Sequence, residues 1–125
     1  MAVAPAFYPG RAPIDAYGDG GFRFAGMSHR GSLLCLPSGI HAWEVARIED
    51  LAPEHLSAAL AEKARFTFLL LGTGPTMVLP SAGVRSAVVE AGVGLDIMDT
   101  GAACRTLNVL LAEGRAVAAA LIAVA

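Results

Sequence analysis

Apolar runs in the second half of the chain predict the strands of a buried sheet. Phe66–Leu71 is apolar at nearly every position, which is typical of a strand covered on both faces. Val93–Met98 is the next expected strand. Ala116–Val124 follows a helix stop at Gly114, and we expect a third strand there, although its alanines also favour a helix.

Apolar residues with helical spacing lie between these strands. Pro53–Ala64 has proline near its first turn and basic residues at its far end, as helices do. Two further helices are expected, one ended by Gly92 and one that begins at Asp99 or Thr100 and ends at Gly114. Their inward stripes are Val84, Ala87, Val88 and Ala91 in the first, and Ala103, Leu107, Leu110 and Leu111 in the second.

Alternating positions dominate the first half. Gly18–Gly21 predicts a turn before a short strand at Phe22–Phe24, and Ser32–Leu36 with Ile40–Val45 predicts a hairpin. We therefore expect an α/β fold: a single three-layer domain over residues 13–125, with a central mixed, largely parallel sheet and an N-terminal β-hairpin. Residues 1–12 are small and aperiodic, and are expected to form a flexible leader.

Composition and charge exclude several classes of function for this chain. The chain has 125 residues, of which 55% are hydrophobic and 16% charged, so one globular unit is expected. A net charge of -2 with scattered basic residues gives no attraction to nucleic acid. No segment reads as a signal peptide, a transit peptide or a transmembrane span, and the two distant cysteines are expected to be buried thiols. The expected setting is a reducing cytoplasm.

Two glycine-bearing corners, each after a strand, are the first candidates for a binding site. Gly72, Thr73 and Gly74 form part of a nucleotide-binding pattern, but Met77 stands where the third glycine of that pattern would be. The ordinary interpretation is a sharp turn out of a buried strand. Asp99-Thr100-Gly101 opens a helix whose free N–H groups attract small anions, unless Asp99 or Thr100 caps them.

Four side chains near these corners carry candidate chemistry. Cys104 lies in the first turns of the helix, where a thiol pKa is lowered, yet its neighbours also suit a buried filler. Arg105 and Asn108 share a helix face, so together they suit a carboxylate or the backbone of a neighbouring loop. His29 is embedded in a polar stretch that is expected to be a turn. No CxxC or HxxxH pattern accompanies it, so no metal site and no cofactor are expected.

Three motifs together resemble a known family. They are Ser28–Leu34 with Pro37–Gly39, then Phe68–Gly74, then Met98–Leu110. In this order they are similar to the Mth-type domain of unknown function, whose mitochondrial members include an assembly factor of respiratory complex I. The resemblance implies a three-layer α/β domain without an established catalytic activity, and relatives that act through protein partners at the inner membrane.

The resemblance maps the family motif onto both corners and the start of the second helix. The chain departs from the family at Leu107, where relatives often have an aromatic residue. None of the motif residues inherits a catalytic role from the family. The motif positions are Gly72, Thr73, Gly74, Asp99, Thr100, Cys104, Arg105, Thr106 and Asn108.

Two functions of different class follow. The first is a non-enzymatic protein-interaction or assembly-accessory domain, with an unidentified protein partner that the resemblance places in a membrane-associated respiratory assembly, at the periphery of the inner membrane. The alternative is a small-molecule or anion site, including a thiol enzyme, in the crevice between Gly72–Pro75 and the helix that starts near Thr100.

Overall fold

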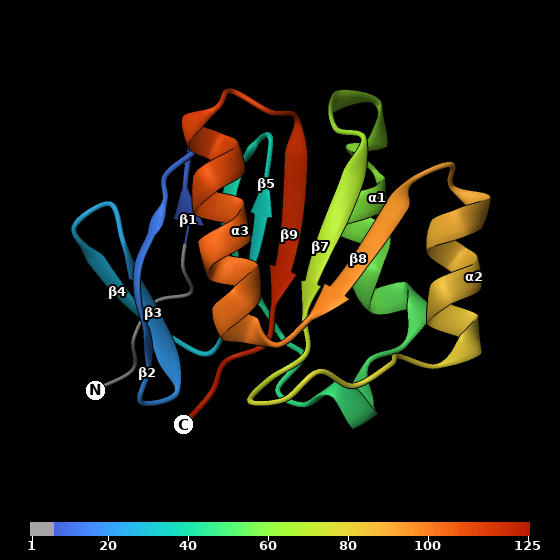
Figure 1. The fold of residues 1–125 in the computed structure, drawn as a ribbon, viewed down its shortest axis with the longest axis horizontal. Coiled ribbons are helices and arrows are strands. Elements are labelled where there is room, and N and C mark those ends of the chain that lie inside the picture. Colours follow the sequence, from blue (N-terminus) through green and yellow to red (C-terminus); the bar gives the residue numbers. More distant parts are fainter. Residues whose placement is uncertain (1–6) are drawn as a thin grey trace.

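The computed structural model describes residues 7–125, which form two sheets and three α-helices (Figure 1). The strands of the larger sheet, in spatial order, are β1 (Phe7–Tyr8), β6 (Gly39–Trp43), β5 (Ser32–Leu36), β9 (Val117–Leu121), β7 (Phe68–Gly72) and β8 (Gly94–Met98). The smaller sheet contains β2 (Ile14–Gly18), β3 (Gly21–Phe24) and β4 (Met27–Arg30). The helices are α1 (Ser57–Leu60), α2 (Ala82–Glu90) and α3 (Thr100–Ala112).

The larger sheet is mixed, as the sequence predicts. β7 runs parallel to both β8 and β9, whereas β5 is antiparallel to β9 and to β6. Among the described strands, parallel pairing is thus limited to one side of the sheet and is less extensive than expected. The ambiguous segment at Ala116–Val124 is a strand, β9, and it lies between β7 and β5 at the centre of the sheet.

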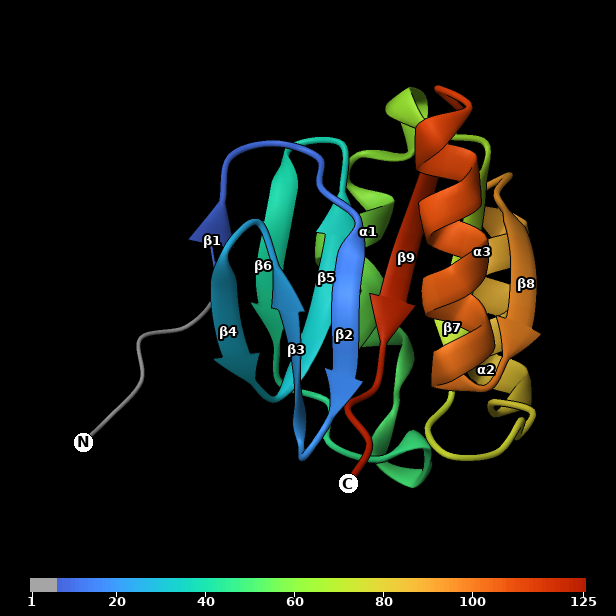
Figure 2. The ribbon, with the colours of Figure 1, turned by 60° about the vertical axis from the view of Figure 1, so that its left-hand side comes forward.

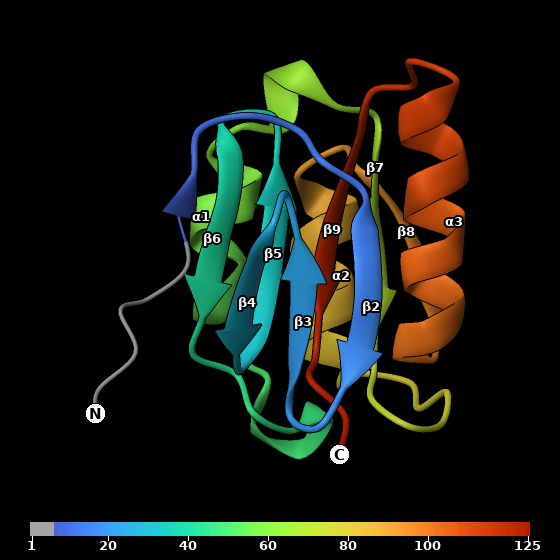
Figure 3. The same cartoon turned by 90° about the vertical axis from the view of Figure 1, so that its left-hand side faces the viewer.

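Both faces of this sheet are covered, so the domain has three layers (Figure 2). Successive residues of the central strands alternate between two cores: Leu69 and Leu71 pack with α1 and α2, and Leu70 packs with α3. Phe22 and Phe24 of the smaller sheet join the α3 side. Figure 3 shows the smaller sheet standing in front of the larger one beside α3. This double burial is the reason for the continuous apolar pattern of β7.

The expected helix at Pro53–Ala64 is wrong as a single element. Only Ser57–Leu60 is α-helical, between 3₁₀ turns at Pro53–Leu56 and Lys63–Arg65. Side chains take hydrogen bonds that a regular helix would make within its backbone. Trp43 Nε1 donates to the carbonyl of His55, and the Ser57 hydroxyl donates to the carbonyl of Glu54. The segment covers the sheet with an irregular coil of short turns.

The polar stretch around His29 is not the expected turn either. It is strand β4, which pairs with β3 so that His29 lies opposite Phe22. The turn lies earlier, at Ala25 and Gly26, which both have positive φ angles, as two-residue hairpin turns require. The apolar-polar alternation of this stretch is too short to indicate a strand by itself. Pairing with β3 makes it one.

The predicted turn at Gly18–Gly21 and the one predicted hairpin are confirmed. Asp19 and Gly20 turn between β2 and β3, and β5 and β6 form the second hairpin. Of the expected leader over residues 1–12, residues 1–6 lie outside the described part. Phe7–Tyr8 pairs with β6, and Ala12 is buried in the core between the smaller sheet and α3.

Candidate functional site

The two corners meet at the carboxyl ends of β7 and β8, as the sequence predicts. The N–H group of Thr73 donates to the carbonyl of Met98 over 2.9 Å, and the N–H group of Thr100 donates to the carbonyl of Gly74 over 2.9 Å. Gly74 N–H in turn donates to Thr100 Oγ1 over 2.9 Å. The two reversals are therefore locked together by reciprocal hydrogen bonds across 26 positions of sequence.

Gly72 allows this close approach because it has no side chain. A Cβ atom at Gly72 would lie 3.0 Å from the Cα atom of Thr100 and 3.2 Å from the Cβ atom of Ala103. Gly74 has a φ angle of +111°, which L-residues with a side chain rarely adopt. The glycines of the first corner thus have structural reasons for their positions, which agrees with the ordinary interpretation of a sharp turn.

The start of α3 is capped by the protein itself. The carboxylate of Asp99 accepts a hydrogen bond of 2.8 Å from the N–H group of Ala102, in the place that a bound anion would take. Above the first turn lies Tyr17, whose hydroxyl oxygen would be 2.4 Å from a Cβ atom at Gly101. These contacts cap the helix start and cover its first turn, and they give the small-molecule alternative no support there.

Thr73 has a different role, because its buried hydroxyl shapes the loop that follows. It donates to the carbonyl of Thr76 over 2.7 Å and accepts from the N–H group of Val78 over 3.0 Å. The loop it holds exposes three consecutive large apolar side chains: 56% of Met77, 40% of Val78 and 61% of Leu79. The sequence analysis missed this feature. Its signal was an apolar triplet directly before Pro80, in a segment with neither helical nor strand periodicity.

Cys104 is buried, and burial raises its pKa to about 12, although the nearby Arg105 guanidinium acts in the opposite direction. A thiol in this state stays protonated at neutral pH, which argues against an activated nucleophile. The environment matches the buried-filler interpretation. Burial raises the pKa of Cys35 to about 12 as well, and both thiols belong to the core between α3 and the smaller sheet.

Asn108 binds backbone and not substrate. Its Oδ1 atom accepts from the N–H group of Ile14 over 2.8 Å, and its Nδ2 atom donates to the carbonyl of the same residue over 2.8 Å. Both sides of the amide thus attach α3 to β2. The neighbouring Arg105 reaches the hydroxyl of Tyr17 at 3.4 Å, also on β2. The helix face that Arg105 and Asn108 share, as the sequence predicted, anchors β2 to α3.

His29 lies on β4 of the smaller sheet, opposite Phe22 of β3. It is buried, and within residues 7–125 its Nδ1 atom has no hydrogen-bond partner. Burial lowers the pKa of His29, because the imidazolium form loses its hydration. This histidine is therefore not brought together with Cys104 or the two corners.

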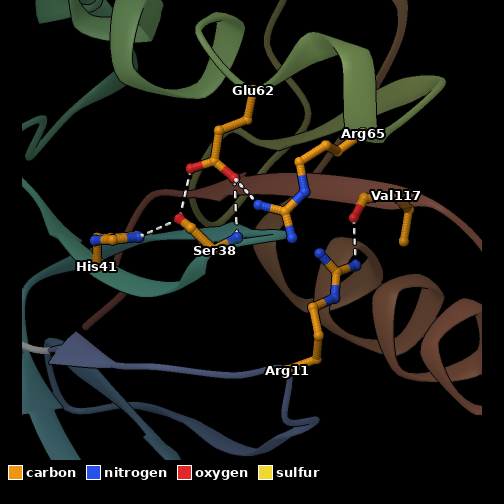
Figure 4. A network of polar contacts seen from close by, with 6 residues as sticks. All are labelled: Arg11, Ser38, His41, Glu62, Arg65 and Val117. Carbon is orange, nitrogen blue, oxygen red and sulfur yellow. Dashed lines mark hydrogen bonds and ion pairs between the residues drawn. The ribbon is translucent and has the colours of Figure 1, made fainter.

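A polar cluster that the sequence analysis did not single out joins the β5–β6 turn to the coil after α1 (Figure 4). Glu62 accepts from both the N–H group and the hydroxyl of Ser38, and His41 Nε2 lies 3.0 Å from Ser38 Oγ. Arg65 Nη1 lies 3.8 Å from Glu62 Oε1. In a hydrolytic triad the histidine would accept the serine proton, whereas here the carboxylate does. The cluster fastens the hairpin and does not activate Ser38.

Among residues 7–125, no three His, Cys, Asp or Glu side chains are grouped so that they could hold a metal ion. In that part of the chain, no helix combines the length and the apolar character needed to cross a bilayer.

Solved structures share this fold. An outer membrane protein from Bartonella henselae is 51% identical and superposes with a TM-score of 0.90, with 94% of this chain and 99% of that chain covered. A Mth938-like domain from Bordetella pertussis is 29% identical, with a TM-score of 0.78 over 98% of this chain and 92% of that one. The resemblance to the Mth-type domain is confirmed.

Sequence relatives extend the comparison. Assembly factor 3 of the NADH dehydrogenase [ubiquinone] 1 alpha subcomplex from Mus musculus is 31% identical over 98% of this chain. The chain spans 66% of the length of that protein. A family model described as a protein of unknown function (DUF498/DUF598) matches residues 14–122.

Proposed function

Because the chain belongs to the DUF498/DUF598 family, which includes assembly factors of NADH dehydrogenase, we propose that it is a non-enzymatic protein-interaction domain that assists assembly of a respiratory complex. Its partner is a protein of that membrane-associated assembly, to which the domain binds from the cytoplasmic side of the inner membrane. The proposal rests on the family relationship together with one surface feature, the exposed apolar loop Met77–Leu79.

Met77–Leu79, called the apolar loop from this point on, has the exposed apolar side chains that a docking element needs. Large apolar side chains scattered singly on a surface are ordinary, but three in succession concentrate exposed apolar surface on one loop. They project from the same end of the sheet where Thr73 and Thr100 join the corners. A partner that covered them would remove apolar surface from water without any change in the domain core.

The apolar loop is also pre-organised. The Thr73 hydroxyl ties the loop at both Thr76 and Val78, and Gly74 is bonded to Thr100. A segment already held in one conformation loses less conformational entropy when it binds, so more of the contact energy contributes to affinity. A rigid loop favours binding to one complementary partner over nonspecific apolar association.

Site-specific photo-crosslinking in the native host tests the proposal. A photoreactive phenylalanine analogue would replace Leu79 in one strain and Val89 in a control strain, since Val89 on α2 is 69% exposed and lies in a helix. We expect the Leu79 probe to capture one subunit or assembly intermediate of NADH dehydrogenase, and the Val89 probe to capture at least tenfold less of it.

A complementation test measures the biological role. The double variant Met77→Ser/Leu79→Ser should fail to restore NADH dehydrogenase assembly in a strain without this protein, while Val89→Ser and Val109→Ser restore it. Both controls remove side chains that are as exposed as those of the loop, so a general loss of surface apolarity is excluded as the cause. Equal capture by both probes, or full complementation by the double variant, would contradict the proposal.

A further inference from the structure

A hollow of about 420 Å³ lies at the opposite end of α3 from the β7–β8 corners. One wall is the segment that leads into β2, with Ala12 and Pro13, and the other is the end of α3, with Leu111 and Ala112. Hollows of this size with mostly apolar walls and a few polar groups are typical of small-molecule sites. Asn108 also lines the hollow, and its Oδ1 and Nδ2 atoms each make one hydrogen bond to the backbone of Ile14.

Arg11 is the charged group at this hollow. It donates one hydrogen bond, from Nη2 to the carbonyl of Val117 (Figure 4), and this bond holds the guanidinium against the start of β9. Across residues 7–125, the three ion pairs within 4 Å involve Arg47, Arg65 and Arg115, and none involves Arg11. Burial lowers the pKa of Arg11, because the guanidinium loses part of its hydration, and the Glu62 carboxylate acts in the opposite direction without offsetting this loss.

A second arginine stands at the rim. Arg115 follows the helix stop at Gly114, and its side chain is 58% exposed. Its only ion pair among the described residues is a long one, 3.9 Å to Glu113, which is also exposed. Exposed pairs of this kind contribute little, so Arg115 is free to turn toward a bound anion. The hollow thus combines an apolar wall with one fixed and one movable cation.

We propose that this hollow binds a small amphipathic carboxylate, such as a medium-chain fatty acid or an aryl carboxylate. The carboxylate pairs with the remaining N–H groups of Arg11, whose planar fork suits two parallel hydrogen bonds. The apolar body lies against Pro13, Leu111 and Ala112. This site is separate from the apolar loop, so the proposed protein interaction and the ligand site stand or fall independently.

Titration of the isotope-labelled domain by NMR tests this inference, with octanoate as the probe. We expect saturable shifts of the backbone amides of Ala12, Leu111, Gly114 and Arg115. Octanol has the same chain without the charge, and acetate has the charge without the chain, so both should bind at least tenfold more weakly. Octanol that binds as tightly as octanoate would overturn the proposal, and so would shifts spread over both sheets.

Variants separate the charge from the packing. Arg11→Gln should weaken octanoate binding about tenfold, because a hydrogen bond to a charged group is lost. Arg115→Gln, at an exposed position, should weaken it about threefold and tests the site even where Arg11→Gln impairs folding. Arg47→Gln, on the opposite side of the sheet, is the matched control and should bind as the parent does. Unchanged affinity in both Arg11→Gln and Arg115→Gln would overturn the assignment.

Discussion

The hydroxyl of Thr100 donates a hydrogen bond of 2.7 Å to the carbonyl of Ile122, 22 positions further along the chain. The same oxygen accepts from Gly74 N–H, so a single fully buried side chain joins the start of α3, the β7 corner and the end of β9. Because β7 and β9 pair in parallel, this hydroxyl links the parallel part of the sheet to α3.

Replacement of Thr100 by valine should therefore destabilise the fold sharply. Valine has the same shape but leaves the N–H group of Gly74 and the carbonyl of Ile122 buried without partners, at a cost of about 2–4 kcal/mol. Urea denaturation followed by circular dichroism measures the loss. Thr100→Ser should retain most of the stability, and Thr76→Val, at an exposed position, should change it by less than about 0.5 kcal/mol. A Thr100→Val protein as stable as the parent would show that the bridge is dispensable.

Cys104 should be unreactive in the folded protein. Because burial raises its pKa to about 12, the thiolate is scarce at pH 6.5 and remains scarce at pH 8.5. A neutral alkylating agent should label it only at the rate at which the protein opens, with little increase between these two pH values. Mass spectrometry of timed samples, with denaturant-unfolded protein as the control, measures this. Fast labelling at pH 6.5 would restore the activated-thiol hypothesis.

Asn108 should be needed to hold β2 against α3. Asn108→Ala removes both hydrogen bonds to Ile14 and should cost about 1–3 kcal/mol. Hydrogen exchange of the Ile14 amide should accelerate more than that of amides in β7. Arg105→Ala, three positions earlier on the same face, is the control; its contact with Tyr17 is exposed, and its loss should be small. Equal effects of the two substitutions would contradict the anchoring role.

His29 should make the domain less stable in mild acid. Its pKa is lower in the folded protein than its ordinary value of 6.5, so the unfolded chain binds the proton more readily. The stability that neutral His29 contributes is complete above pH 6.5 and is lost as the pH falls toward the lower, folded value. His29→Phe should flatten the dependence of the unfolding free energy on pH between 7 and 5. Ser28→Ala, exposed on the same strand, should leave the slope unchanged; a parent-like slope in His29→Phe would assign the effect to other groups.

The neighbouring corners were within reach of sequence reasoning. A buried apolar strand, a glycine corner and a helix stripe repeat from Phe66 to Leu111, and right-handed crossovers place the ends of parallel strands on one edge. The irregular coil at Pro53–Arg65 was not predictable in the same way, because the bond from Trp43 to the carbonyl of His55 comes from a strand ten or more positions away. The role of Asn108 depends in turn on β2, a partner 94 positions distant.

The chain by itself determined the elements from β7 to β9, the two-sided burial of β7 and the capped start of α3, because each follows from the pattern of residues close together in sequence. Tertiary structure alone decided that Asn108 binds the backbone of Ile14, 94 positions away, and that Thr100 joins the β7 corner to the end of β9. The physical reason is that a buried polar group forms its hydrogen bond with whichever donor or acceptor lies nearest once the chain is packed. For these residues, the nearest partner is set by strand order and not by sequence separation.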